Sequence, residues 1–270
     1  MEKIVRSIVS QINQKIEIHP EIAIVLGSGL SDIVDCMDEK IIIPYNELEG
    51  MLKTKVEGHK NQFIVGKLAG KNVIAMQGRF HLYDGFSAKQ VAMPIYIFKE
   101  LGIKTLILTN AAGGVKDDMK PGDIAVICDH INNTATNCMI GGPIIDYGTQ
   151  FVDMSEPYNN DYIQIVENIA KKESIKLCKG TYMQFLGPFY ETKADIIMAK
   201  RVGADIVGMS TAVEVEAANH CGLKVLALSV ITNKATGLST EKNSHKDVLK
   251  ASFSASKKLI KIVQEFVNQL

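Results

Sequence analysis

The feature that most constrains the fold is an alternation of short β-rich runs with segments of helical periodicity. The expected strands are IAIVL (22–26), TLILTN (105–110), IAVICD (124–129) and VLALSVIT (225–232). The expected helices lie near residues 87–101, 159–172, 192–202, 211–221 and 245–268. Because helices that connect parallel strands cover both faces of the sheet, the alternation predicts an α/β fold with a mostly parallel central β-sheet flanked by helices.

One segment departs from this alternation. Residues 62–78 (QFIVGKLAGKNVIAMQG) hold two strand-like runs joined by a glycine-containing turn, which predicts an antiparallel hairpin and therefore a mixed sheet. No proline- or serine-rich linker and no repeat divides the chain, so we expect a single domain over 1–270. The one long irregular stretch, 132–158, is expected to be a functional loop.

Composition argues against several classes of function. Lys plus Arg and Asp plus Glu each total 30, so no net charge attracts nucleic acid or an anionic membrane. The five cysteines are odd in number and scattered, which argues against a disulfide framework and against a metal site of the zinc type. The N-terminal segment spaces Ile4, Ile8, Ile12 and Ile16 as one face of an amphipathic helix, unlike a signal peptide. We therefore expect a cytoplasmic protein.

The glycine-rich turn VLGSGLSD (25–32) follows the first expected strand, where many proteins bind a phosphate. A dinucleotide fingerprint would need glycine at position 32, but Asp32 stands there and would oppose a pyrophosphate. The turn alone leaves open whether the ligand is a dinucleotide or another anion.

Two further segments offer polar groups near strand ends. The AAGG at 111–114 either lets backbone N–H groups approach an anion or forms a tight turn. In MQGRFHLYDG, Arg79, His81 and Tyr83 occupy alternate positions, so an extended backbone would point all three to one side. Each residue type is individually more often structural, but the shared side favours a site.

A third segment, GPFYETKAD, places Tyr190 beside Glu191. An aromatic face beside a carboxylate can stack on a flat ring and accept its N–H groups. The alternative is that Glu191 is only a charge at a helix N-terminus, with Thr192 as the expected cap of the helix that follows.

The remaining candidates each have an ordinary structural interpretation. Ser210, which follows Met209, either caps the next helix or binds an anion, and capping is the default. Asn233 either ends a buried strand beside a ligand or forms a turn. His59 and His245 lie in loops or at a helix start, where histidines are usually solvated.

Taken in order, nine segments resemble the trimeric purine nucleoside phosphorylases, a family that includes methylthioadenosine phosphorylase. The segments are LGSGL, GH, QGRFHLYDG, NAAGG, GPFYET, VGMST, HCGLKV, SVITN and a late SH, and the resemblance runs from about residue 20 to the C-terminus. It implies a phosphorylase/hydrolase-like fold, a homotrimer, and reversible phosphorolysis of purine (deoxy)ribonucleosides such as inosine and guanosine. The products would be the free base and (deoxy)ribose 1-phosphate, with phosphate as a co-substrate and no cofactor or metal.

The resemblance also implies a role for each candidate residue. Phosphate binding falls to Ser28, His59, Arg79, His81, the backbone at Ala111, and Ser210. Ribose contacts fall to Tyr83, Met209, His81 and His245, with Phe151 inserted from the neighbouring subunit. The base would lie against Tyr190, Glu191 and Asn233. Asn233 is the leading catalytic candidate, accompanied by Glu191 and by His81, whose part in proton transfer stays open.

These roles are chemically coherent. Glycosidic cleavage passes through an oxocarbenium-like sugar, so Asn233 can donate to N7 of the purine as negative charge grows there. Glu191 can accept N1–H from hypoxanthine or guanine but would face a bare acceptor in adenine. Methylthioadenosine phosphorylases usually have aspartate where this chain has Asn233, so asparagine favours inosine and guanosine. Val213 and Phe189 depart from the family pattern and leave xanthosine open.

Two hypotheses from other classes remain. An NAD-dependent oxidoreductase would explain an α/β fold with a glycine-rich first turn, although Asp32 breaks its fingerprint. A non-catalytic nucleoside-binding protein would keep the base pocket but would not need Ser28, Arg79 and Ser210 together.

Overall fold

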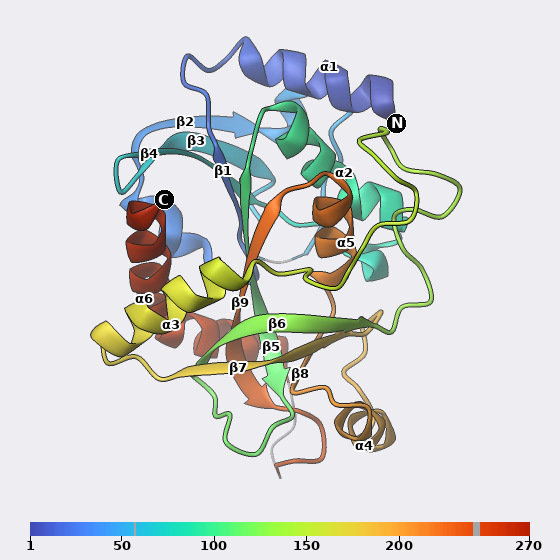
Figure 1. Ribbon diagram of the computed structural model, residues 1–270, viewed down its shortest axis with the longest axis vertical. Coiled ribbons are helices and arrows are strands. Elements are labelled where there is room, and N and C mark those ends of the chain that lie inside the picture. The colour runs from blue at the N-terminus through green and yellow to red at the C-terminus, as the bar shows by residue number, and fades with distance from the viewer. Residues whose placement is uncertain (57, 240–243) are drawn as a thin grey trace.

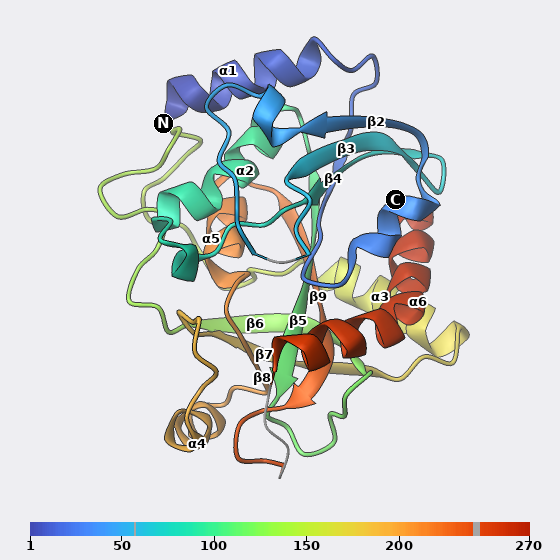
Figure 2. The ribbon, with the colours of Figure 1, turned by 180° about the vertical axis from the view of Figure 1, so that it is seen from behind.

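The computed structural model describes residues 1–56, 58–239 and 244–270, and within them nine strands form one mixed sheet (Figures 1 and 2). The order of the strands is β2-β3-β4-β1-β5-β8-β7-β6-β9, and β5 also pairs with β9. The strands are β1 (Ile22–Val25), β2 (Asp38–Pro44), β3 (Gln62–Leu68), β4 (Lys71–Gln77), β5 (Thr105–Gly114), β6 (Ile124–Asn132), β7 (Leu177–Gln184), β8 (Ile206–Gly208) and β9 (Lys224–Lys234).

The directions of the pairings confirm the predicted mixed sheet. Parallel pairs join β1 to β4 and β5, β5 to β9, and β7 to β6 and β8. The predicted hairpin is β3 and β4, which pair antiparallel with Phe63 opposite Met76. Further antiparallel pairs are β2 with β3, β5 with β8, and β6 with β9.

Helices cover both sides of this sheet. They are α1 (Glu2–Asn13), α2 (Ala88–Glu100), α3 (Asn160–Lys172), α4 (Lys193–Arg201), α5 (Ala212–His220) and α6 (His245–Gln269). In Figure 1, α2 packs with α5 on one side of β5 and β9, and α3 packs with α6 on the other. The sheet between them is consequently buried on both faces, and Ile24, Ile107 and Leu226 of its central strands are 0% exposed. The predicted single-domain α/β fold is confirmed.

Three strands were not predicted from the sequence. Strand β2 begins with the charged residues DEK and is mostly exposed, because it lies at the edge of the sheet. Strand β7 (LCKGTYMQ) mixes polar residues and glycine with apolar ones, and β8 has only three residues. None of the three has the continuous apolar run or strict alternation that marks a strand in a sequence.

The N-terminal segment buries three of the four predicted isoleucines, Ile8, Ile12 and Ile16. Helix α1 buries Val5, Ile8, Val9 and Ile12, whereas Ile4 is 41% exposed. A series at every fourth residue drifts around a helix with 3.6 residues per turn, so the buried stripe combines spacings of three and four.

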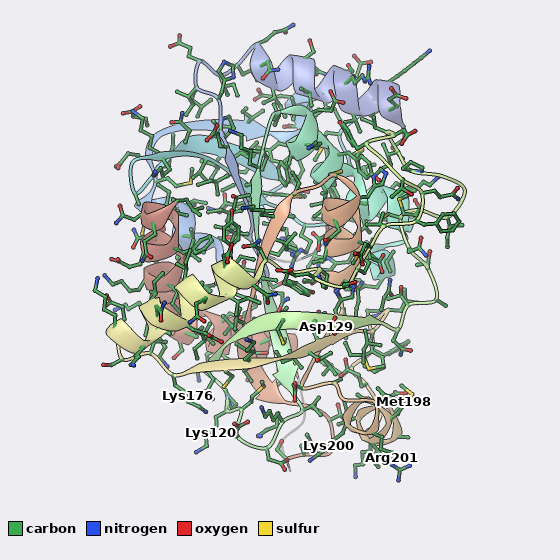
Figure 3. All side chains as sticks on the ribbon, viewed as in Figure 1. Lys120, Asp129, Lys176, Met198, Lys200 and Arg201 are labelled. Carbon is green, nitrogen blue, oxygen red and sulfur yellow. The ribbon has the colours of Figure 1, made fainter. Side chains whose placement is uncertain are left out.

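The end of the molecule around α4 exposes several lysine and arginine side chains. Figure 3 shows Lys200 and Arg201 projecting from α4, and Lys120 and Lys176 lie at the same end. Lys200 Nζ lies 3.0 Å from Asp117 Oδ1, and Lys176 pairs with Asp123. Within the described part of the chain, no helix combines the length and apolarity needed to cross a bilayer.

The N-terminus of α2 offers a test of local stability. Ser87 Oγ accepts a hydrogen bond from Gln90 N at 3.3 Å, and Gln90 Oε1 accepts one from Ser87 N at 2.9 Å. Because this capping box satisfies two otherwise unpaired donors, Ser87→Ala should lower the free energy of unfolding by about 1 kcal/mol. Urea denaturation at fixed protein concentration measures this loss. The matched variant Ser10→Ala, at an exposed position inside α1, should show none, and equal denaturation midpoints for the two variants would contradict the prediction.

Candidate active site

One pocket gathers most of the residues that the sequence singled out. It lies near the carboxyl ends of β1, β5, β8 and β9 and near the segment that follows β4. Open α/β sheets usually bind their ligands at the carboxyl ends of the strands. The pocket is lined by Ser28, Arg79, His81, Tyr83, Ala111, Tyr190, Glu191, Met209, Ser210 and Asn233, together with neighbouring backbone. Residues far apart in the chain therefore line one pocket.

The glycine-rich turn after β1 lies directly against β5. A Cβ at Gly27 would come within 2.7 Å of Asn110 Cα, and Gly27 N donates to Thr109 Oγ1 at 3.1 Å. Glycine is therefore needed for close packing against β5, which places Ser28 in the pocket wall. Asp32 is not part of the pocket lining and lies in the short helix Ser31–Cys36.

Arg79 is the most buried cation of the site, with 1% of its surface exposed. Its Nη1 donates to Thr109 O at 2.8 Å and to Ser210 Oγ at 3.2 Å, while its Nε donates to Glu214 Oε1 at 3.0 Å. Among the described residues, Nη2 has no hydrogen-bond partner. A buried guanidinium donor in a pocket wall can bind an anion.

His81 and Tyr83 share a wall, but not for the reason predicted. His81 has an extended backbone, whereas Tyr83 lies in the short helix Leu82–Asp84, and the two rings stack with centroids 4.6 Å apart. Burial lowers the pKa of His81, although Asp84, whose Oδ2 lies 3.8 Å from His81 Nδ1, acts in the opposite direction. The imidazole is consequently neutral near pH 7. The ring of His59 lies 5.7 Å from that of His81, beside the pocket rather than in its lining.

The AAGG segment is strand, so its interpretation as a turn is wrong. Strand β5 runs to Gly114, and Gly113 pairs antiparallel with Val207 of β8 and parallel with Asn233 of β9. A Cβ at Gly113 would lie 3.2 Å from Val207 Cγ2 and 3.4 Å from Asn233 Nδ2. The small residue lets the amide of Asn233 sit close to β5.

Asn233 also lies within a strand, so its interpretation as a turn residue is wrong as well. It belongs to β9, where its Oδ1 accepts from Thr232 Oγ1 at 2.8 Å and its Nδ2 donates to Lys234 O at 2.9 Å. These two bonds determine which end of the amide is the donor, and the second N–H of Nδ2 remains for a ligand.

Tyr190 and Glu191 form another part of the lining. Tyr190 is 37% exposed, whereas Glu191 is only 8% exposed, and burial raises the pKa of its carboxyl group. Thr192 caps α4 as predicted, because its side chain accepts from Asp195 N. Glu191 therefore precedes the cap and faces the pocket as well as standing at a helix N-terminus.

The junction between β8 and α5 shows that the interpretation of Ser210 as the helix cap is wrong. The N-cap of α5 is Thr211, in a capping box with Glu214, and Ser210 instead bonds to Arg79. Glu214 is 3% exposed and was not identified from the sequence, although the Thr-x-x-Glu pattern at 211–214 is the signature of a capping box. Preceding Ser210, Met209 packs so closely that a Cβ at Gly187 would lie 2.6 Å from its Sδ.

Phe151 and the two divergent residues, Phe189 and Val213, lie apart from the pocket lining. Phe151, in the long loop after β6, is 86% exposed, and so is Phe189, which therefore does not fill the pocket. Val213 is 0% exposed within α5. His245 is the first residue of α6, but its side chain lies outside the described part of the chain, so the expected ribose contact is untested.

Comparison with known proteins adds independent information. The family model of the phosphorylase superfamily matches residues 21–268. Purine nucleoside phosphorylase 1 of Bacillus subtilis is 41% identical over 258 residues, which cover 96% of this chain and 95% of that protein. The mouse purine nucleoside phosphorylase is 39% identical, with 93% and 89% covered. The chain therefore belongs to the phosphorylase superfamily and, within it, to the purine nucleoside phosphorylases.

Solved structures agree with this assignment. Schistosoma mansoni purine nucleoside phosphorylase in complex with inosine superposes with a TM-score of 0.94 at 35% identity, covering 99% of this chain and 96% of that one. A Schistosoma purine nucleoside phosphorylase in complex with guanosine gives a TM-score of 0.91.

Proposed function

We propose that this chain catalyses the reversible phosphorolysis of 6-oxopurine (deoxy)ribonucleosides, inosine and guanosine above all, to free base and (deoxy)ribose 1-phosphate. The observation that carries the proposal is the buried, incompletely paired guanidinium of Arg79 in the same pocket as Glu191 and Asn233. An anion donor set and a base-recognition set in one pocket suit a reaction between phosphate and a nucleoside. The inosine and guanosine complexes of the Schistosoma enzymes support the nucleoside half.

The phosphate would bind against Arg79, Ser28, Ser210 and the backbone at Ala111. Arg79 supplies the charge and its free Nη2 donor, while the hydroxyl groups and the backbone N–H give direction. His81 stands at the same wall with its pKa lowered, so we assign it a neutral hydrogen-bonding role toward phosphate and sugar. His59, beside His81, would close this end of the site.

The base would stack on Tyr190, with Glu191 accepting N1–H and Asn233 donating to N7. As the glycosidic bond breaks, the sugar becomes oxocarbenium-like and the purine gains negative charge. A donor at N7 binds that charge more strongly than it binds the substrate, which accelerates the reaction. Tyr83 and Met209 would flank the ribose between the two halves. The proposal assigns every role to side chains and phosphate, and it invokes no cofactor or metal.

A homotrimer and a cytoplasmic location belong to the same proposal. Phe151 is a large aromatic side chain that is 86% exposed on a long loop, which suits insertion into the ribose pocket of a neighbouring subunit. All five cysteines, each within the described residues, are free thiols, as in reducing compartments. A solution mass measurement tests the trimer.

The decisive assay measures hypoxanthine release from inosine with and without phosphate. We expect release only when phosphate is present, with ribose 1-phosphate formed in equal amount. Release without phosphate would identify a hydrolase, and tight inosine binding without release would identify a nucleoside-binding protein. Parallel reactions with xanthosine and methylthioadenosine define the base preference, and labelled NAD tests the oxidoreductase hypothesis, which the family match does not favour.

A further inference from the structure

The turn that carries Ser210 has an unusual backbone at its next residue. Thr211 has φ 87° and ψ −54°, and Ala212 N donates to Ser210 O at 3.2 Å, which closes a γ-turn. A β-branched residue rarely adopts a positive φ, because its side chain clashes with the backbone. Such a conformation persists only where surrounding interactions hold it.

Three buried contacts with polar side chains hold Thr211 in this turn. Thr211 N donates to Glu214 Oε2 at 3.0 Å, Asn110 Nδ2 donates to Thr211 Oγ1 at 2.9 Å, and the hydroxyl groups of Ser210 and Thr211 lie 3.2 Å apart. Thr211 itself is 0% exposed. The turn is therefore anchored to β5 through Asn110 and to α5 through Glu214.

The second oxygen of the same carboxylate binds the cation of the site. Glu214 Oε1 accepts from Arg79 Nε at 3.0 Å, and the two side chains are 3% and 1% exposed. Arg79 in turn donates to Ser210 Oγ, which closes a ring of contacts through the turn. One buried carboxylate thus determines the position of both the arginine and the serine expected to bind phosphate.

We propose that Glu214 is a positioning residue of the phosphate site, holding Arg79 and the strained turn at Ser210 and Thr211 in one arrangement. The inference rests on the proposed function, because it assumes that phosphate binds at Arg79 and Ser210. A carboxylate can accept from both N–H groups, one on each oxygen. A glutamine has a single acceptor oxygen, so its NH₂ group must face either Arg79 Nε–H or Thr211 N–H, donor against donor.

Because Glu214 is charged, an electrostatic role and a positioning role predict opposite changes in phosphate binding when it is replaced by glutamine. If only the electric field mattered, Glu214→Gln would remove a negative charge from beside Arg79 and would strengthen phosphate binding. A positioning role predicts the opposite, because Arg79 or the turn at Ser210 is released. We expect Glu214→Gln to raise the KM for phosphate about tenfold or more, in line with losing a buried charge-assisted hydrogen bond. The KM for inosine should change by less than about threefold, since the base-binding groups are untouched.

The experiment measures both KM values and kcat, and also phosphate binding alone, from the thermal stabilisation of the protein by increasing phosphate without nucleoside. The matched control is Glu216→Gln on the same helix. Glu216 Oε1 accepts from Asn132 Nδ2 at 2.8 Å and is not part of the pocket lining, so this variant should keep the phosphate KM within about twofold. The concentration of phosphate needed for half-maximal stabilisation should rise for Glu214→Gln and not for the control.

A lower or unchanged KM for phosphate in Glu214→Gln, or an equal rise in both KM values, would overturn the positioning role. If that variant does not fold, Glu214→Asp keeps the charge but shortens the side chain by one CH₂ group. It should raise the phosphate KM in the same direction, and an unchanged value would overturn the proposal. An assay of the wild-type protein distinguishes failure of the proposed function from failure of the positioning role. Phosphate-independent release of hypoxanthine by the wild type refutes the proposed function, whatever the Glu214 variants show.

Discussion

Replacing Glu191 with alanine should lower kcat/KM for inosine by about a hundredfold or more, because the buried N1–H of the base loses a charged acceptor. Glu191 is 8% exposed in the pocket lining, so solvent cannot readily take its place. Steady-state kinetics with inosine measure the loss. Glu191→Gln keeps one acceptor oxygen without the charge and should fall between the wild type and the alanine variant.

The pH dependence of the same reaction gives a second measurement. Burial raises the pKa of Glu191 above its ordinary value, and the ionised carboxylate accepts N1–H more strongly than the protonated acid does. The kcat/KM for inosine should therefore fall on the acid side with a midpoint above the ordinary pKa of glutamate, and Glu191→Gln should lack this limb. Identical acid limbs in the two proteins would contradict the assignment.

Stability provides the control for these variants. Since the folded-state pKa of Glu191 is raised, the folded protein holds its proton more tightly, and ionisation of this group reduces stability as the pH rises through that pKa. Glu191→Gln should consequently be at least as stable as the wild type at neutral pH, with the difference vanishing in acid. A loss of activity accompanied by a gain in thermal stability cannot be attributed to unfolding.

The second large effect concerns the choice of base. Asn233→Asp should lower kcat/KM for inosine and raise it for adenosine, shifting the ratio of the two by about a hundredfold. A carboxylate in this place would repel O6 and the negative charge that grows at N7, but it can accept the 6-amino group of adenine. The position of the amide is well determined, because Thr232 Oγ1 and Lys234 O bind its two ends.

Competition between inosine and adenosine in one reaction measures this ratio directly. Asn72→Asp is the matched control, since the side chain of Asn72 donates to His19 O outside the pocket. The control should keep the wild-type ratio. An unchanged ratio in Asn233→Asp would remove Asn233 from base recognition.

The main elements of the fold could be predicted because their signals are carried by consecutive residues. Strands β1, β5 and β9 are apolar runs that are buried on both faces, as are the first four residues of β6, and the hairpin of β3 and β4 has its own turn. Edge strand β2 and the short β8 could not be predicted, because their strand conformation depends on neighbours in the sheet. The isoleucine spacing likewise indicated helix α1 and the burial of Ile8 and Ile12. That Ile4 is exposed while Val5 and Val9 are buried depends on what the helix packs against.

The site was predicted in part for the same reason. Arg79, His81 and Tyr83 are close in the sequence, so their grouping was visible, although a short helix rather than a continuous strand brings Tyr83 to the wall. Ser210 and Thr211 are neighbours as well, but which one caps α5 depends on their backbone angles. Glu214 was missed because its functional partner, Arg79, is 135 residues away.

The sequence by itself determined the alternation of strands and helices, the hairpin, and the order of motifs that resembles the purine nucleoside phosphorylases. Only the tertiary structure decided that 111–114 continue a strand, that Asn233 lies beside Gly113, and that Glu214 joins Arg79 to the turn at Thr211. The physical reason is that periodicity and turn chemistry act over a few residues, whereas buried hydrogen bonds and ion pairs form only after distant segments have packed and excluded water.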